Sequence, residues 1–184
     1  MIRTLFLLAG MASCLLFGNP AAQAQNTNAA AIKQPDNFVA WRTGLSSAAQ
    51  PSRKYLEQAA QLKYDVVINL APPESWGSLE NEGALIGKQG LAYVNIPVSF
   101  EKPRAEDFEL FSGMLKAAEG KNVLVHCQAN FRGSSFVFLY RVIVEKIPVQ
   151  EAATKLTGVW VPDAAWKKFI QQTLASHGYK DDFL

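Results

Sequence analysis

Hydrophobic residues along the chain follow two alternating patterns. Short aliphatic runs are typical of buried strands, whereas longer segments with apolar residues every three or four positions predict helices. The strands expected from the first pattern are at 38–44, 64–70, 92–98 and 123–127. The helices expected from the second are at 51–63, 79–90, 105–119, about 132–143, 149–156 and 163–176. This alternation predicts a single α/β domain, in which helices flank a mostly parallel sheet of four to five strands.

Prolines and a glycine refine three of these elements. Pro51 is expected at the first position of its helix, where the missing N–H does no harm. Pro97 indicates that its strand lies at an edge of the sheet or ends there. The segment 38–44 ends in a glycine turn and is typical of a short edge strand. These two strands are therefore the expected edges.

The strand that ends at Cys127 leads directly to the helix that begins at about Arg132. The first turn of a helix has N–H groups without intrahelical acceptors, and the helix dipole favours a negative charge there. Such a place stabilises both a thiolate and an oxyanion. Arg132 adds a planar set of donors that suits a tetrahedral anion. Together these groups are the components that covalent catalysis on such an anion requires.

The composition is that of a globular protein, with 184 residues, 49% of them hydrophobic and 18% charged, and a formal net charge of +2. Residues 1–24 have a positive start, an apolar run and a small-residue cleavage site, as a secretory signal has. The apolar run is short for a membrane span. We therefore expect an exported, periplasmic protein without stable membrane insertion after cleavage. Residues 25–37 are expected to be a disordered lead-in, and 38–184 to form the domain.

Removal of residues 1–24 would leave Cys127 as the only thiol. Exported proteins usually pair their cysteines, so an unpaired one is either an inert core residue or a reactive group. A near-neutral charge without a basic cluster argues against a nucleic-acid partner. Two histidines and one cysteine make no plausible metal site, and no cofactor is expected.

His126, Cys127 and Arg132, placed after an aliphatic strand, resemble the signature of cysteine-dependent phosphatases of the protein tyrosine and dual-specificity type. The upstream strands are also similar to those of a compact bacterial branch of phosphatase-like proteins. The likeness extends over about residues 38–176. It implies a phosphatase-like α/β fold and hydrolysis of phosphate monoesters, phosphotyrosine among them, through a phosphocysteine intermediate.

The resemblance also implies roles for the loop residues. Cys127 would attack phosphorus as a thiolate, and Arg132 would hold the phosphate oxygens. His126 would orient the loop by hydrogen bonds, and Ser134 would assist the thiol. Asn130 stands in place of a signature glycine, which a left-handed backbone tolerates. The phosphate would be bound by Gln128, Ala129, Asn130, Phe131, Gly133 and Ser134.

The spacing of the loop leaves a rival activity open. The phosphatase signature has five residues between Cys and Arg, whereas this chain has four between Cys127 and Arg132. Four residues resemble the loop of rhodanese-type sulfurtransferases, which carry a persulfide on the Cys. A non-catalytic module that binds phosphate or sulfate is a third alternative. The expected partner is accordingly a phosphorylated small molecule or protein, or a sulfur-donor anion.

A phosphatase of this type also uses a general acid to protonate the leaving oxygen. The resemblance implies an Asp shortly after the strand at 95–98, where this chain has Ser99, Phe100 and Glu101. Glu101 is the only carboxylate near that point before the next helix, and it is our candidate acid. Asp163, in a Trp-Val-Pro-Asp sequence, follows the catalytic loop and is expected to cap a helix.

Overall fold

The computed structural model describes residues 32–180. The predicted signal, residues 1–24, and residues 25–31 of the predicted lead-in lie outside the described residues. The strands are β1 (Val39–Arg42), β2 (Leu45–Ala48), β3 (Val66–Asn69), β4 (Ala92–Asn95) and β5 (Val123–His126). A mostly parallel sheet of five strands with flanking helices confirms the predicted α/β class.

The strands form one sheet in the order β1-β2-β5-β3-β4. β2, β5, β3 and β4 are parallel, and β1 is antiparallel to β2. β5 lies in the centre, where His126 is opposite Ala48 on one side and Asn69 on the other. β1 and β4 are the edges, as predicted. The carboxyl ends of four parallel strands therefore meet beside Cys127, at the sheet edge where α/β proteins bind ligands.

β2 is absent from the sequence-based expectation, although all four of its residues are buried. Two of the four are serines, so the segment has no hydrophobic run. The Ser47 hydroxyl accepts a hydrogen bond from the indole N–H of Trp41 at 2.8 Å. Partners of this kind allow polar residues to occupy a buried strand.

The helices are α1 (Arg53–Leu56), α2 (Glu82–Gly87), α3 (Ala105–Ala117), α4 (Phe131–Ile143), α5 (Val149–Thr157) and α6 (Ala164–Ser176). All six correspond to predicted helices, but α1 and α2 are shorter than predicted. Ser52 caps α1 by accepting from the Tyr55 N–H at 3.2 Å, so Pro51 precedes the cap instead of opening the helix. Residues 57–63 continue as hydrogen-bonded turns.

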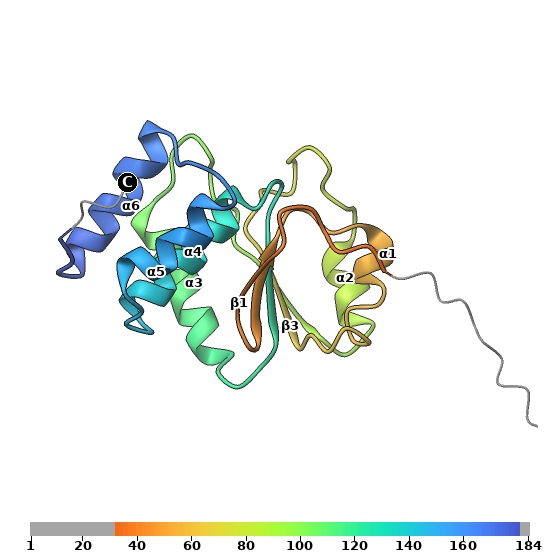
Figure 1. Ribbon diagram of the computed structural model, residues 1–184. Coiled ribbons are helices and arrows are strands. Elements are labelled where there is room, and N and C mark those ends of the chain that lie inside the picture. The colour runs from red at the N-terminus through yellow and green to blue at the C-terminus, as the bar shows by residue number, and fades with distance from the viewer. Residues whose placement is uncertain (1–31, 181–184) are drawn as a thin grey trace, which may run out of the picture. The chain divides into compact units, whose positions relative to one another are not determined.

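The sheet separates two hydrophobic layers (Figure 1). α1 and α2 cover one face, and α3, α4, α5 and α6 lie over the other. Side chains alternate along β5, so Val125 and the following Cys127 belong to the core on the α4 side. Leu124 belongs to the core on the α1 and α2 side, and His126 faces Glu82 there.

The sequence predicts α4 as an amphipathic helix, but every residue from Arg132 to Ile143 is buried. The reason is that α3, α5 and α6 cover the surface of α4 that the sheet leaves open. The helix that follows the candidate nucleophile is therefore held on all sides. Neither α4 nor any other helix within residues 32–180 is long and apolar enough to cross a membrane.

Candidate active site

The candidate nucleophile is the first residue after β5. Cys127 is buried, and its N–H donates to the Ala48 carbonyl at 3.4 Å. The preceding carbonyl, of His126, accepts from the Leu70 N–H at 2.8 Å. The peptide before the thiol is thus fixed from both neighbouring strands. Cys127 lines a cavity of about 280 Å³ together with Phe100, Glu101, Gln128, Ala129, Phe131 and Arg132. The three predicted catalytic residues therefore meet around one small cavity.

Asn130 holds the loop between Cys127 and α4 in shape. It adopts the left-handed conformation, with φ 67° and ψ 6°. Its side-chain amide donates to the Asn37 carbonyl at 2.6 Å, and the Asn37 amide donates to the Ala129 carbonyl at 3.0 Å. Asn130 Oδ1 lies so close to Gly133 that a Cβ at position 133 would be 2.6 Å away. A glycine at this place therefore allows the Asn130 side chain to fit.

These contacts extend the domain into the predicted lead-in. The Asn37 side chain holds the loop through the Ala129 carbonyl. The backbone carbonyl of Asp36 accepts a hydrogen bond from the Ala49 N–H at 2.9 Å. Residues 25–37 have no hydrophobic periodicity, so sequence patterns could not reveal this order. Backbone and amide hydrogen bonds position the segment instead. The folded domain thus begins before the predicted boundary at residue 38.

The first turn of α4 includes two residues that line the cavity, Phe131 and Arg132. The Ser134 N–H is bonded within the helix, to the Asn130 carbonyl at 2.8 Å. The N–H groups of Phe131, Arg132 and Gly133 precede it and have no intrahelical acceptor. With the helix dipole, they favour an anion at this end of α4.

Arg132 is 7% exposed and is held at one nitrogen only. Its Nε–H donates to the Val98 carbonyl at 2.9 Å, and its guanidinium carbon lies 5.3 Å from the ring centroid of Phe100. Among the residues that the structure describes, none is hydrogen-bonded to its two terminal nitrogens. The guanidinium is therefore oriented in advance and can bind two oxygens of an anion.

Glu101 lies at the exposed rim of the same cavity. Its carboxylate accepts a hydrogen bond from the Ser99 hydroxyl at 3.3 Å. Two hydrogen bonds anchor the backbone just before Glu101. The Val98 carbonyl accepts from Arg132 Nε–H at 2.9 Å, and the Phe100 carbonyl accepts from the Trp166 indole N–H at 2.8 Å. The candidate acid is thus carried on a fixed segment, and its carboxylate is accessible to solvent.

An aromatic group lies next to the cavity. Phe131 stacks on Trp160, with a centroid distance of 4.5 Å and an angle of 4° between the rings. Phe100 contacts both rings, at 6.3 and 5.9 Å. The sequence gives no direct sign of this group, because its members come from three separate segments. Two of these three rings, those of Phe100 and Phe131, also line the cavity and form its aromatic wall.

Two further residues singled out from the sequence lie outside the cavity. The Ser134 hydroxyl is buried and donates to the Phe131 carbonyl at 3.3 Å. Its described partner is thus backbone, not the thiol. Asp163 caps α6 by accepting from the Trp166 N–H at 3.0 Å, which confirms the predicted cap.

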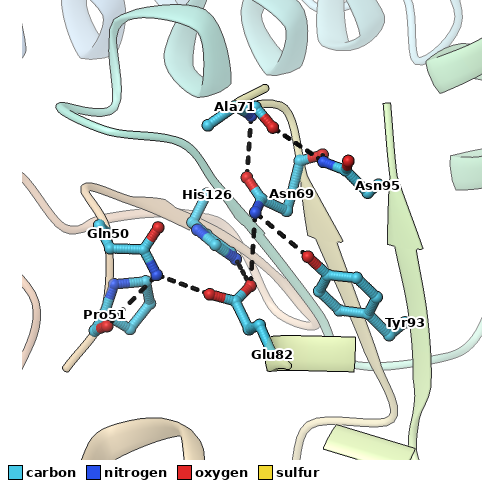
Figure 2. Close-up of polar contacts among 8 residues, drawn as sticks. All are labelled: Gln50, Pro51, Asn69, Ala71, Glu82, Tyr93, Asn95 and His126. Atoms are coloured by element: carbon cyan, nitrogen blue, oxygen red, sulfur yellow. Dashed lines mark hydrogen bonds and ion pairs between the residues drawn. The ribbon is translucent and has the colours of Figure 1, made fainter. Parts of the chain in front are cut away.

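His126 faces away from the loop and contacts Glu82 (Figure 2). Its Nε2 lies 2.8 Å from Glu82 Oε1, and both side chains are buried. Within the described residues, the contact of the His126 imidazole is thus with α2, on the face of the sheet opposite the Cys127 side chain. Glu82 is absent from the sequence-based candidates, because nothing in the local pattern distinguishes it from other residues of a surface helix.

Hydrogen bonds keep Glu82 ionised although it is buried. Burial alone would raise its pKa, but His126, Gln50 and Tyr93 donate to the carboxylate and lower the pKa below its ordinary value of 4.5. Burial, followed by the charge of Glu82, raises the pKa of Tyr93 to about 12. Glu82 and Tyr93 also line a second, polar cavity of about 510 Å³ at the ends of β3 and β4. Within residues 32–180, no group of three or more His, Cys, Asp or Glu side chains is arranged to hold a metal ion.

The fold and the sequence are similar to those of a bacterial protein of known structure. A candidate phosphatase of the DUF442 family from Shewanella putrefaciens CN-32 is 32% identical to this chain, with a TM-score of 0.72. The alignment covers 79% of this chain and 95% of that protein. The chain belongs to the DUF442 family. The relative from Shewanella is described as a candidate phosphatase, in agreement with the phosphatase resemblance of the Cys and Arg loop.

Two structures outside the DUF442 family are also similar. The core catalytic domain of the PP-IP phosphatase SIW14 from S. cerevisiae, in complex with citrate, is 14% identical with a TM-score of 0.64, over 76% of this chain and 86% of that one. A Cys-to-Ser variant of P. aeruginosa TpbA in complex with phosphotyrosine is 16% identical with a TM-score of 0.59, over 78% and 91%. At these identities the likeness shows the fold alone. No protein-family model and no curated protein matches the sequence.

Proposed function

We propose that this DUF442 protein hydrolyses phosphate monoesters through a phosphocysteine intermediate on Cys127. The observation that carries the proposal is the cavity that Cys127 and Arg132 line together, beside the N-terminus of α4. These groups supply a nucleophile, a fixed cation and preorganised donors for an oxyanion. Membership of the DUF442 family, one member of which is described as a candidate phosphatase, supports the same activity.

In the first step, the Cys127 thiolate attacks phosphorus. An S–P bond forms as the bond from phosphorus to the ester oxygen breaks. Arg132 and the loop amides from Gln128 to Gly133 stabilise the charge on the equatorial oxygens. Glu101, in its protonated form, gives its proton to the leaving oxygen. The products are an alcohol or phenol and phosphocysteine.

In the second step, a water molecule attacks the phosphocysteine. The Glu101 carboxylate takes a proton from this water, and the new P–O bond forms as the S–P bond breaks. The electron pair of that bond returns to sulfur, so the Cys127 thiolate and the Glu101 acid are both restored. Inorganic phosphate then leaves the cavity.

The aromatic wall favours aryl esters, which include phosphotyrosine. Phe100 and Phe131 both line the cavity. Trp160 stacks on Phe131 and holds its ring in place. A phenyl leaving group can pack against these rings in an offset or edge-to-face arrangement. The partner would accordingly be an aryl phosphate, either a small molecule or a protein carrying phosphotyrosine.

The spacing between Cys127 and Arg132 supports a rival activity, sulfur transfer. Four intervening residues resemble the rhodanese loop, and the same cavity could hold a sulfane sulfur on Cys127 with a donor anion on Arg132. Sulfur transfer would need no general acid. A loop that only binds phosphate or sulfate would bind the same anions without turnover.

We also propose that the chain is exported, as residues 1–24 resemble a secretory signal and export would place the enzyme in the periplasm. The N-terminal sequence of the protein recovered from a periplasmic extract tests this proposal. Cleavage after Ala24 is expected. An intact Met1 in the cytoplasmic fraction would contradict it.

Two assays on the full chain, run side by side, test the activity. One follows release of phosphate from an aryl phosphate, and the other follows cyanide-dependent turnover of thiosulfate. We expect phosphate release that Cys127→Ser abolishes, and no thiosulfate turnover. Thiosulfate turnover without phosphate release would replace the proposal with its rival. Anion binding that survives Cys127→Ser, without turnover in either assay, would support the non-catalytic module.

A further inference from the structure

A second cavity adjoins the one that contains Cys127 and Arg132, and Glu101 lines both. It has a volume of about 500 Å³ and lies between α6 and the segment that leads into α3. Lys102 lines it on the side of that segment, and Lys168 lines it on the side of α6. We call it the lysine cavity.

Two contacts fix the walls of the lysine cavity relative to each other. Near the start of α6, the Trp166 indole N–H donates to the Phe100 carbonyl at 2.8 Å. Just after the end of α6, His177 Nε2 lies 3.3 Å from Glu109 Oε1 of α3. The cavity is therefore formed before any ligand enters it, which lowers the entropic cost of binding.

The charged groups of the lysine cavity are suited to an anion. Both lysine side chains are exposed, and neither ammonium group has a hydrogen-bond or ion-pair partner among the residues that the structure describes. Arg104, on the same segment, is instead paired with Asp107. Glu101 is the one carboxylate that lines the cavity, and in the first step of the proposed reaction it is protonated and therefore neutral. Two unpaired positive charges then remain.

The general acid fixes where the leaving group begins. Glu101 gives its proton to the leaving oxygen, so the bond that breaks must lie beside Glu101 and the rest of the leaving group extends from there. The lysine cavity adjoins this point. We propose that it binds a second anionic group on the leaving group, so that the substrate is a phosphate monoester with an additional carboxylate or phosphate. This inference rests on the proposed function, in which Glu101 is the acid.

The remaining lining of the lysine cavity suits the carbon skeleton of such a leaving group. Pro103 and Phe169 provide apolar surface, and the Gln172 amide provides a further donor. The cavity at the ends of β3 and β4 is unsuitable for an anion, because Glu80 and Glu82 line it and no Lys or Arg does. The lysine cavity is thus the one of these two that attracts a negative group.

The test compares two fluorescent pentapeptides with a central phosphotyrosine. One has Glu at its four other positions, and the other has Gln there. The kcat/KM for phosphate release is measured at an ionic strength of about 0.05 M, where exposed charges are weakly screened. The variants are Lys102→Gln, Lys168→Gln and the double variant. Lys88→Gln is the control, because Lys88 is an exposed lysine at the end of α2, on the other face of the sheet.

We expect the parent chain to prefer the acidic peptide about tenfold. Each single variant should lose about two- to fivefold of that preference, as for partly exposed ion pairs, and the double variant should lose nearly all of it. Lys88→Gln should keep it. Equal kcat/KM for the two peptides in the parent would overturn the inference. So would a preference that survives in the double variant, or one that falls as much in Lys88→Gln, since net charge alone would then explain it.

Fluorescence anisotropy gives the same comparison without turnover, with Cys127→Ser added to each chain. A binding preference for the acidic peptide that the double variant loses, in a protein that releases no phosphate, would reject only the proposed function. Phosphate release without any preference would reject only the inference. A third peptide, with phosphoserine in place of Glu, distinguishes the two anions: tighter binding than that of the Glu peptide assigns a phosphate to the lysine cavity, and weaker binding assigns a carboxylate.

Discussion

Gly133→Ala tests whether the catalytic loop depends on the fit between Asn130 and α4. The new Cβ would lie 2.6 Å from Asn130 Oδ1, whereas ordinary van der Waals contacts begin at 3.4 Å. The Asn130 amide must therefore withdraw by about 0.8 Å. Asn130 is a short side chain on a left-handed backbone, and its Nδ2 is bonded to the Asn37 carbonyl at 2.6 Å. It has little freedom to withdraw without losing that bond.

The magnitude follows from two opposing effects. Loss of a buried hydrogen bond costs about 1–3 kcal/mol. Alanine in place of glycine within a helix gains about 0.5–1 kcal/mol. We therefore expect a net destabilisation of about 0.5–2 kcal/mol, or a melting temperature lower by a few degrees for a chain of this length. Displacement of the loop amides should also lower kcat/KM for an aryl phosphate about 10²-fold.

Gly113→Ala is the matched control for thermal denaturation, followed by circular dichroism. Gly113 lies in α3, and a Cβ there would meet no atom within 4 Å. Only the helix propensity should act, so this variant should melt higher than the parent chain and keep its activity. If Gly133→Ala is as stable and as active as Gly113→Ala, the catalytic loop does not depend on the fit between Asn130 and Gly133.

Three further predictions follow from the site. Arg132→Lys keeps the charge but loses the planar guanidinium and its hydrogen bond to the Val98 carbonyl. The kcat/KM for an aryl phosphate should therefore fall about 10²–10³-fold. Near-parental activity would contradict the proposed binding of phosphate by the guanidinium. Glu101→Gln should slow hydrolysis of alkyl phosphates about 10²–10⁴-fold and affect an activated aryl phosphate much less, whereas equal losses would reject its role as the acid. The depressed pKa of Glu82 contributes stability that is present above its ordinary value of 4.5 and is lost as the pH falls through the folded value. The difference in unfolding free energy between the parent and Glu82→Gln, measured in urea, should therefore shrink as the pH falls below 4.5, and a constant difference would count against this linkage.

Local features of the sequence predict the nucleophile and its setting. The sequence places Cys127 only five positions before Arg132, at the start of the helix. This short spacing alone brings the two side chains close together. Asn130 in a left-handed conformation and Asp163 as a helix cap are equally local, since each depends on one residue type at one backbone position. The edge positions of β1 and β4 follow from a glycine turn and a proline.

Features that depend on tertiary contact could not be read in this way. Glu82 meets His126 only because β3, β4 and β5 bring α2 over the end of the sheet. Ser46 and Ser47 belong to an interior strand because hydrogen-bond partners satisfy their hydroxyls, which a hydrophobic pattern cannot show. The burial of every residue of α4 after Phe131 likewise depends on three helices elsewhere in the chain.

The most direct test of the central claim is to trap the intermediate on Cys127. The full chain is mixed with an aryl phosphate, quenched in acid within milliseconds, and analysed by peptide mass spectrometry. One phosphoryl group is expected on Cys127 in the parent chain and none on this site in Cys127→Ser. Phosphate release without an adduct on Cys127, or an added sulfur atom on Cys127 after incubation with thiosulfate in a chain that releases no phosphate, would contradict it.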